Sequence, residues 1–160
     1  MRVLIVSDTH GKHTGLDRAL AEAGEIDVFI HLGDVEGGED YLEAAVSCEK
    51  HIIRGNNDFF TDLPKEEEFY LGGQKVFLTH GHSYYVTLDP EYIWEEAQAR
   101  QADIVMYGHT HRPFFAQKGG VTVLNPGSIS FPRQENRKAS YMIMEILPDG
   151  TVSYDQRYLE

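Results

Sequence analysis

Residues 2–10 read RVLIVSDTH, an apolar run that passes directly into a polar cluster. The segment Arg2–Val6 is apolar after its first residue, which is typical of a parallel strand buried on both faces. Asp8 and His10 follow at the point where this strand would end. The stretch therefore predicts a buried strand whose carboxyl end carries side chains that bind metals.

The same alternation continues along the first half of the chain. Leu16–Ala23 has a helical apolar face, and Gly24 is expected to end that helix. Asp27–Leu32 reads as a second strand, Glu39–Ser47 as a second helix and His51–Arg54 as a third strand. This β-α-β-α-β order predicts a parallel sheet with helices packed against it.

The second half is dominated by hairpins. Asp89-Pro90-Glu91 is typical of a helix start, with Asp89 as cap, and predicts a helix to Gln101 before a strand at Asp103–Tyr107. We expect an α/β (α+β) fold of two mixed sheets packed face to face as a sandwich flanked by helices, in one domain over residues 1–160. The expected strand pairs are Glu68–Leu71 with Lys75–Thr79 across Gly72-Gly73, Phe114–Gln117 with Val121–Leu124 across Gly119-Gly120, and Ser140–Leu147 with Thr151–Tyr158 across Pro148-Asp149-Gly150.

Composition limits the partners. The net charge is −12, from 14 basic and 26 acidic side chains, so polyanionic nucleic acid and anionic membrane surfaces are disfavoured. A small anionic substrate remains compatible, because bound dications would reverse the local sign. The single cysteine, Cys48, suits a reducing compartment, and Val3–Val6 is too short for a signal peptide or a membrane span. We expect a cytoplasmic protein.

Five polar clusters each follow an apolar strand-like run. The carboxyl ends of parallel strands meet at one edge of a sheet, so clusters far apart in the sequence are expected to converge there. Carboxylate, imidazole and amide oxygen are ligands for Mn, Fe, Zn or Ni, and two adjacent dications would activate a water and bind a phosphoryl group. The clusters are Asp8 with His10, Gly33-Asp34, Gly55-Asn56-Asn57-Asp58, His80-Gly81-His82 and Gly108-His109-Thr110-His111.

These motifs, in this order up to Asn125-Pro126-Gly127-Ser128, resemble the calcineurin-like metallophosphoesterases, and among them the small single-domain phosphodiesterases of bacteria and archaea. The resemblance implies two divalent metal ions, with Mn expected and Ni, Zn or Fe as alternatives. It implies that a hydroxide bridging the metals attacks a small phosphoester substrate. One metal would be held by Asp8, His10, Asp34 and His111, and the other by Asp34, Asn56, His80 and His109.

The catalytic candidates are Asp34, Asn56 and His82. Larger members of the resembled family carry a histidine as general acid after the metal-binding asparagine, whereas this chain has Asn57 there. His82 is a substitute proton donor or phosphate contact, or alternatively forms a hydrogen bond that orients a ligand. Arg133 has two open readings as well, a contact to a phosphate oxygen or an exposed side chain without a role.

Several further residues are expected to be structural. Asp58 is interpreted as a turn residue or a support for the ligands, and His31 as a packed, hydrogen-bonded histidine. For Asn125 and Ser128, a loop near the substrate and a simple turn remain alternatives. The acidic run Glu66-Glu67-Glu68 is predicted to be a solvated loop, and Pro126–Lys138 a loop over the site.

Two other functions compete with a phosphodiesterase. In the resembled superfamily a eukaryotic retromer subunit keeps the fold with an altered metal site and serves as a binding platform, so a non-catalytic interaction scaffold is the alternative. A nuclease subunit is disfavoured by the net charge of −12. The assembly stays open, with a homodimer or a homotetramer as candidates and Tyr84, Tyr85, Tyr92 and Trp94 as contacts or pocket walls.

Overall fold

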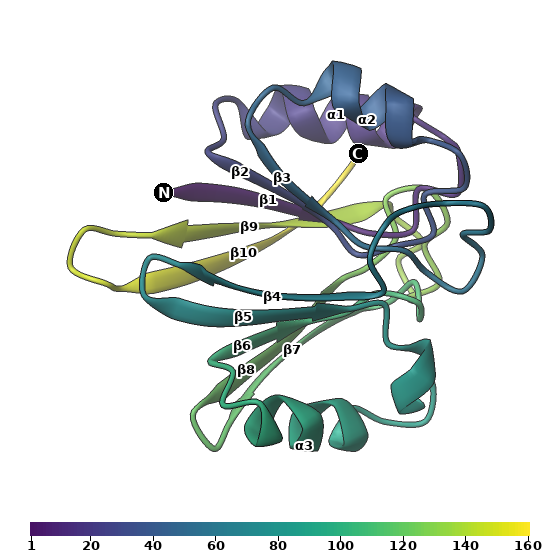
Figure 1. Ribbon diagram of the computed structural model, residues 1–160. Coiled ribbons are helices and arrows are strands. Elements are labelled where there is room, and N and C mark those ends of the chain that lie inside the picture. Colours follow the sequence, from purple (N-terminus) through teal and green to yellow (C-terminus); the bar gives the residue numbers. More distant parts are fainter.

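The first sheet gathers both ends of the chain. The computed structural model describes all 160 residues, and its ten strands form two five-stranded sheets that face each other (Figure 1). In the first sheet the order is β10-β9-β1-β2-β3, with β1–β3 parallel and β9 antiparallel to both β1 and β10. Its strands are β1 (Arg2–Val6), β2 (Val28–His31), β3 (Glu49–Ile52), β9 (Ser140–Ile146) and β10 (Val152–Tyr158).

The second sheet is mixed as well. Its order is β4-β5-β6-β8-β7, in which β5, β6 and β8 are parallel and the two outer strands run antiparallel to their neighbours. The predicted sandwich of two mixed sheets is therefore confirmed. The strands are β4 (Glu66–Leu71), β5 (Gln74–Thr79), β6 (Ile104–Met106), β7 (Pro113–Lys118) and β8 (Val121–Pro126).

Helices cover the outer faces of the sandwich. α1 (Thr14–Ala23) and α2 (Glu39–Ala45) lie on the first sheet, and α3 (Glu91–Ala99) lies on the second (Figure 1). A short 3-10 turn, η1 (His82–Tyr84), follows β5. One cluster of 15 buried apolar residues fills the space between the sheets. A second cluster lies between the first sheet and α1 and α2, and a third lies between the second sheet and α3. None of the helices combines the length and the apolar character needed to cross a bilayer.

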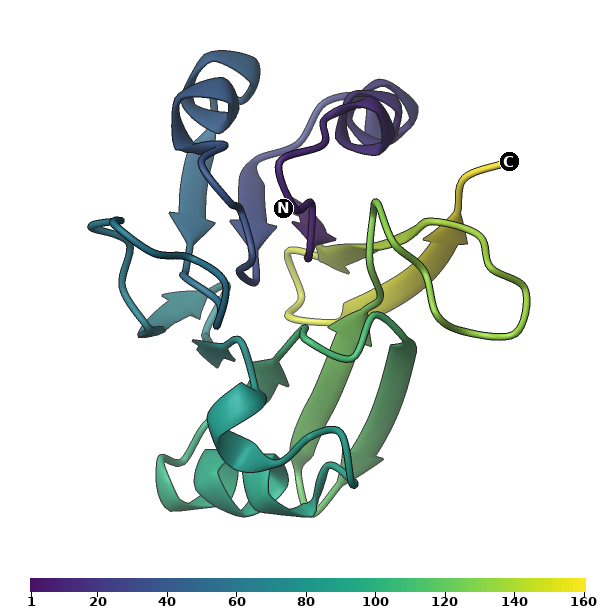
Figure 2. The same ribbon diagram turned by 90° about the vertical axis from the view of Figure 1, so that its right-hand side faces the viewer.

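The parallel strands of both sheets end on the same side of the molecule. In Figure 1 their exits gather at the right, and in Figure 2 this edge faces the viewer. The loop between β8 and β9, residues 127–139, also borders this edge. The topology thus brings all five polar clusters to one place, as the strand pattern predicted.

One local prediction was wrong, and the bounds of two predicted elements differ by about two residues. Glu66-Glu67-Glu68 is not a solvated loop but the start of β4, because its carboxylates have partners: Glu66 accepts hydrogen bonds from Arg100 and Tyr84, and Glu67 contacts His51. The third strand runs over Glu49–Ile52, two residues earlier than predicted, since the chain leaves the sheet before Arg54. The third helix ends at Ala99 rather than Gln101 and begins at Glu91, after Pro90, while Asp89 accepts a hydrogen bond from the Glu91 N–H (2.9 Å).

Candidate metal centre

The predicted ligands leave their strands through unusual backbone conformations. Five of the seven predicted ligands have a left-handed φ, between 50° and 69°: Asp8, His10, Asp34, His109 and His111. In this region of φ every residue other than glycine is strained. Such strain persists only where the surroundings enforce it, and it clusters at functional sites. The strained residues come from the exits of β1, β2 and β6, so three separate strands pay a conformational cost to aim side chains at one point.

Glycines let these exits crowd together. A Cβ on Gly108 would collide with Ser7 Oγ and lie 2.8 Å from Asp8 Oδ2. A Cβ on Gly33 would lie 2.7 Å from both the Gly55 nitrogen and His80 Nδ1. Only a residue without a side chain fits at these two positions, which explains the glycines that precede Asp34 and His109.

The first ligand group forms around Asp8. Its Oδ1 lies 3.3 Å from His111 Nε2 and 3.6 Å from His10 Nε2, and those two nitrogens are 3.0 Å apart. Asp34 Oδ2 lies 3.7 Å from His10 Nε2. The ligand atoms of Asp8, His10 and His111 all lie within 4.8 Å of one another, and Asp34 belongs to a second such group with Asp8 and His80.

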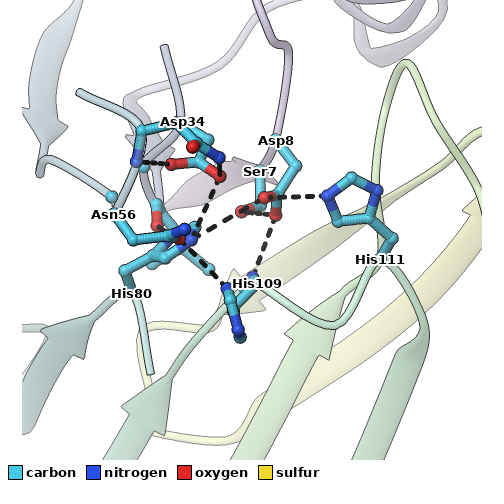
Figure 3. A network of polar contacts seen from close by, with 12 residues as sticks. Ser7, Asp8, Asp34, Asn56, His80, His109 and His111 are labelled. Carbon is cyan, nitrogen blue, oxygen red and sulfur yellow. Dashed lines mark hydrogen bonds and ion pairs between the residues drawn. The ribbon is translucent and has the colours of Figure 1, made fainter. Parts of the chain in front are cut away.

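The second group adjoins the first. Asp34 Oδ2 is 3.4 Å from His80 Nε2, and Asn56 Oδ1 is 3.1 Å from His109 Nδ1. Figure 3 shows Asp8 between His111 on one side and His80 on the other, with Asn56 and His109 beside His80. Asp8 Oδ1 is also 3.8 Å from His80 Nε2, so the carboxylates of Asp8 and Asp34 each lie close to both ligand groups.

Contacts behind the imidazoles fix which nitrogen faces the centre. The carbonyls of Leu32 and Phe131 accept hydrogen bonds from Nδ1 of His80 and His111, each at 2.7 Å, and Glu36 holds Nδ1 of His10 at 2.9 Å. Each contact leaves Nε2 directed at the carboxylates, the arrangement by which metal-binding histidines are oriented. Glu36 and Phe131 were not among the predicted site residues, because neither lies in a polar cluster that follows a strand directly.

The residues present fit a metal. Two fully buried polar atoms, Asp8 Oδ1 and His80 Nε2, have no hydrogen-bond partner, and both face the shared space. Such atoms are costly unless something binds them. Burial opposes ionisation of Asp8, but the neighbouring imidazoles of His10, His111 and His80 outweigh this and hold its pKa well below the usual range. A buried carboxylate that stays charged among imidazoles is a donor set suited to a divalent cation.

The remaining candidates divide into two groups. Asp58, Asn125 and Ser128 are buried and support the backbone: Asn125 bonds Gly108 O at 2.9 Å, and Ser128 bonds Asp8 O at 2.9 Å. His31 is buried and hydrogen-bonded to Thr9 and the Gly33 N–H, as predicted.

His82 lies beside the centre and is exposed. Its ring centroid is 5.6 Å from that of His80, and it lines one hollow with Asn56. The Leu32 carbonyl, and not His82, contacts Nδ1 of His80. Asn57 turns its amide onto Asp34 Oδ2 at 3.0 Å.

We expect the protein to fold without metal and to gain stability when metal binds. Three buried apolar clusters already provide a core, and metal binding would relieve the crowding of Asp8 and Asp34. At a free Mn concentration of 100 times Kd the gain would be about 2.7 kcal/mol. Circular dichroism melting of chelator-stripped protein, with and without Mn, measures it. A largely unfolded stripped protein would contradict the expectation, and an unchanged Tm without bound metal would favour the scaffold function.

The fold and the donor set together define a metallophosphoesterase. Residues 1–149 match the sequence profile of the calcineurin-like phosphoesterase superfamily domain, so the chain belongs to this superfamily. The family resemblance and the fold expected from the motifs are confirmed.

Named relatives agree with this membership. The chain is 33% identical to a probable metallophosphoesterase of Bacillus subtilis, YsnB, over 98% of this chain and 92% of that protein. It is 32% identical to the phosphodiesterase YfcE of Escherichia coli, over 91% and 88% of the two chains. A crystal structure of wild-type Vps29 from Entamoeba histolytica complexed with zinc superposes with a TM-score of 0.78, at 28% identity and 99% coverage of both chains.

Proposed function

We propose that the protein is a metal-dependent phosphodiesterase with a binuclear centre. The observation that carries this proposal is the pair of adjoining ligand groups, in which the buried Asp8 Oδ1 and His80 Nε2 face one space without protein partners. Asp8, His10, Asp34 and His111 would hold one ion, and Asp34, Asn56, His80 and His109 the other. When bound, the metals would supply Lewis acidity toward a phosphoryl group and lower the pKa of a coordinated water.

The protein residues would bind and orient the substrate. Asp34 Oδ2 lies between the two ligand groups, 3.7 Å from His10 and 3.4 Å from His80, which suits a bridging role. Asn56 would contribute a neutral amide oxygen, so the centre keeps a positive charge for an anionic ester. His82 is the exposed imidazole nearest to Asn56 and would contact the phosphoryl group or the leaving group.

Diesters are the preferred substrate class for two reasons. A relative of known name, YfcE, is called a phosphodiesterase. In addition, Asn57 has no titratable proton and is bonded to Asp34, so the chain lacks an acid at this position for a poor leaving group. We propose Mn as the preferred ion, with Ni, Zn or Fe as alternatives.

A panel experiment tests the function. Metal-free protein is supplied in turn with Mn, Ni, Zn and Mg and assayed on bis(4-nitrophenyl) phosphate, 4-nitrophenyl phosphate and an alkyl monoester, while metal content is measured in parallel. We expect turnover that depends on metal and favours the diester. Two bound metals without turnover of any ester would support the interaction scaffold, for which the likeness to Vps29 provides a precedent.

Replacing Asn57 with histidine is expected to help poor leaving groups more than good ones. The imidazole would supply a proton to a departing alkoxide. A well-placed general acid typically raises the reaction rate by about 100-fold or more. The measurement is the dependence of kcat/KM on leaving-group pKa across aryl and alkyl esters, which should become flatter. Asn57→Ala is the control, because it also loses the contact to Asp34 Oδ2 (3.0 Å) but adds no acid. An equal change for all leaving groups would show that protonation is not the missing step.

A further inference from the structure

The unpaired cations of this chain are gathered around the metal centre. Acidic side chains outnumber basic ones by 26 to 14, so a lysine or arginine readily finds a carboxylate. Seven of the basic residues nevertheless have no carboxylate within 4.0 Å. Of these seven, only Lys75 lies away from the hollows at the strand exits, and its Nζ donates to the Arg100 carbonyl. The other six are Lys12, Arg54, Lys65, Arg112, Arg133 and Arg137.

One hollow joins these cations directly to the predicted ligands. It has a volume of about 820 Å³, is open to solvent, and is lined by His10 and His111 together with Arg133 and Arg137. A group bound there would therefore lie beside the predicted ligands. Its one carboxylate, Glu36, is engaged with His10 Nδ1 at 2.9 Å, so the two guanidinium groups keep their charge unopposed.

Phe131 extends the positive wall. Its ring meets His10 edge-on at 5.4 Å between centroids, and the Lys12 ammonium sits 4.4 Å from the centre of the same ring. A cation over an aromatic face is held in place by the ring, which brings the charge of Lys12 to the border of the hollow. Two arginines therefore line the hollow that His10 and His111 border, and Lys12 lies over the Phe131 ring that lines it as well.

The loop that carries the two arginines is held in shape. Gln134 Nε2 donates to Asn136 Oδ1 and to the Lys138 carbonyl, both at 2.6 Å, and Arg133 N–H donates to the His111 carbonyl at 3.0 Å. Arg137 itself has a left-handed φ of 55°, a strained conformation for a residue with a long side chain. The backbone of Arg133 is thus held directly against His111, and that of Arg137 is held by a hydrogen bond to the Gln134 carbonyl in the same loop.

We propose that this hollow binds a second anionic group of the substrate, a phosphate or carboxylate on one arm of the ester, held by Arg133 and Arg137 with Lys12 beside them. Guanidinium groups bind phosphate oxygens in pairs, and an arginine without a carboxylate partner is free to do so. The inference rests on the proposed function, because it extends the substrate of that same site. It makes the substrate a phosphodiester with at least one further negative charge, such as a diester of a nucleotide that carries a second phosphate.

Direct binding tests the subsite. Adenosine 3′,5′-bisphosphate and adenosine 5′-monophosphate, both of the product class, are titrated into Mn-loaded protein by isothermal calorimetry. We expect the bisphosphate to bind about 10-fold tighter or more, and the double substitution Arg133→Gln with Arg137→Gln to reduce this preference to about twofold. Lys75→Gln removes an equal charge per residue far from the hollow and should keep the preference.

The outcomes separate the two proposals. No preference in the unchanged protein, or the same preference after the double substitution, would overturn the subsite. A preference that depends on the arginines, in a protein that hydrolyses no diester, would keep the subsite and reject the phosphodiesterase function. Melting curves of each variant check folding, because Arg133 and Arg137 are exposed whereas Lys75 is half-buried.

Discussion

Replacing Asp34 with asparagine is expected to lower phosphoester turnover by about 1000-fold and to reduce the occupancy of both metals. The carboxylate lies 3.7 Å from Nε2 of His10 and 3.4 Å from Nε2 of His80, one member of each ligand group. An amide carries no charge and cannot neutralise two cations, so metal binding and the stabilisation of charge in the transition state should both weaken. A 1000-fold lower rate corresponds to about 4 kcal/mol of lost transition-state stabilisation. Metal content by mass spectrometry and steady-state kinetics on an activated diester provide the measurement.

Two comparisons sharpen this test. Asp40→Asn removes the same charge from an exposed position on α2 and should change neither quantity. Asp8→Asn is the informative rival, because Asp8 Oδ1 approaches His10, His111 and His80 within 3.8 Å. Its second oxygen is engaged by Ser7 Oγ at 2.5 Å and by the His109 N–H at 3.1 Å, so we expect Asp8 to serve chiefly one metal. Loss of both metals in Asp8→Asn and of one in Asp34→Asn would reverse the two roles.

Much of the fold could be predicted because its central strands are buried on both faces. Segments such as Arg2–Val6 and Val28–His31 are apolar runs that cannot be stable on a surface, and they alternate with helical segments in the order that parallel strands require. The positions of the metal-binding candidates followed from the same fact. Parallel strands end at one edge, so residues as far apart as Asp8 and His111 could be placed together without knowledge of the loops.

The first residues of two edge strands were not predicted by this reasoning. β3 and the start of β4 are polar, and their residues are stabilised by side-chain pairs that lie far apart in the sequence. His51 stacks on Phe69 and contacts Glu67, and Arg100 reaches back from the end of α3 to Glu66. Periodicity reports burial against a core, and it does not detect side-chain contacts of this kind between residues distant in the sequence.

The supports of the site were also hidden. Glu36 and the Phe131 carbonyl orient His10 and His111, but a carboxylate and a backbone oxygen in loops carry no sequence signal of that role. The backbone conformation could not be predicted either, because the residue types Asp and His do not by themselves indicate a left-handed φ. The glycines next to the ligands were the one visible trace of this crowding.

Replacing Asp58 with alanine is expected to destabilise the protein by about 3 kcal/mol or more and to disorganise the metal centre. The side chain is buried and accepts four backbone hydrogen bonds. Its Oδ2 binds the N–H groups of Asp34 (2.8 Å), Val35 (3.2 Å) and Gly55 (2.7 Å), and its Oδ1 binds that of Glu36 (2.7 Å). Each buried donor left unpaired costs about 1–3 kcal/mol, less where water enters. Urea unfolding measures the loss.

The position of these four bonds links stability to function. They tie the exit of β2, which carries Asp34, to the exit of β3, which carries Asn56, so one carboxylate sets the distance between two predicted metal ligands. Asp58→Asn keeps the shape but turns one acceptor into a donor that would face a backbone N–H, and should fall between alanine and the natural residue. Asp62→Ala removes a nearby exposed carboxylate that forms no ion pair, and should leave both unfolding and metal content unchanged. Unfolding of Asp58→Ala at the same urea concentration as Asp62→Ala would contradict this expectation. Water would then replace the carboxylate fully, and the spacing of the two strand exits would not depend on Asp58.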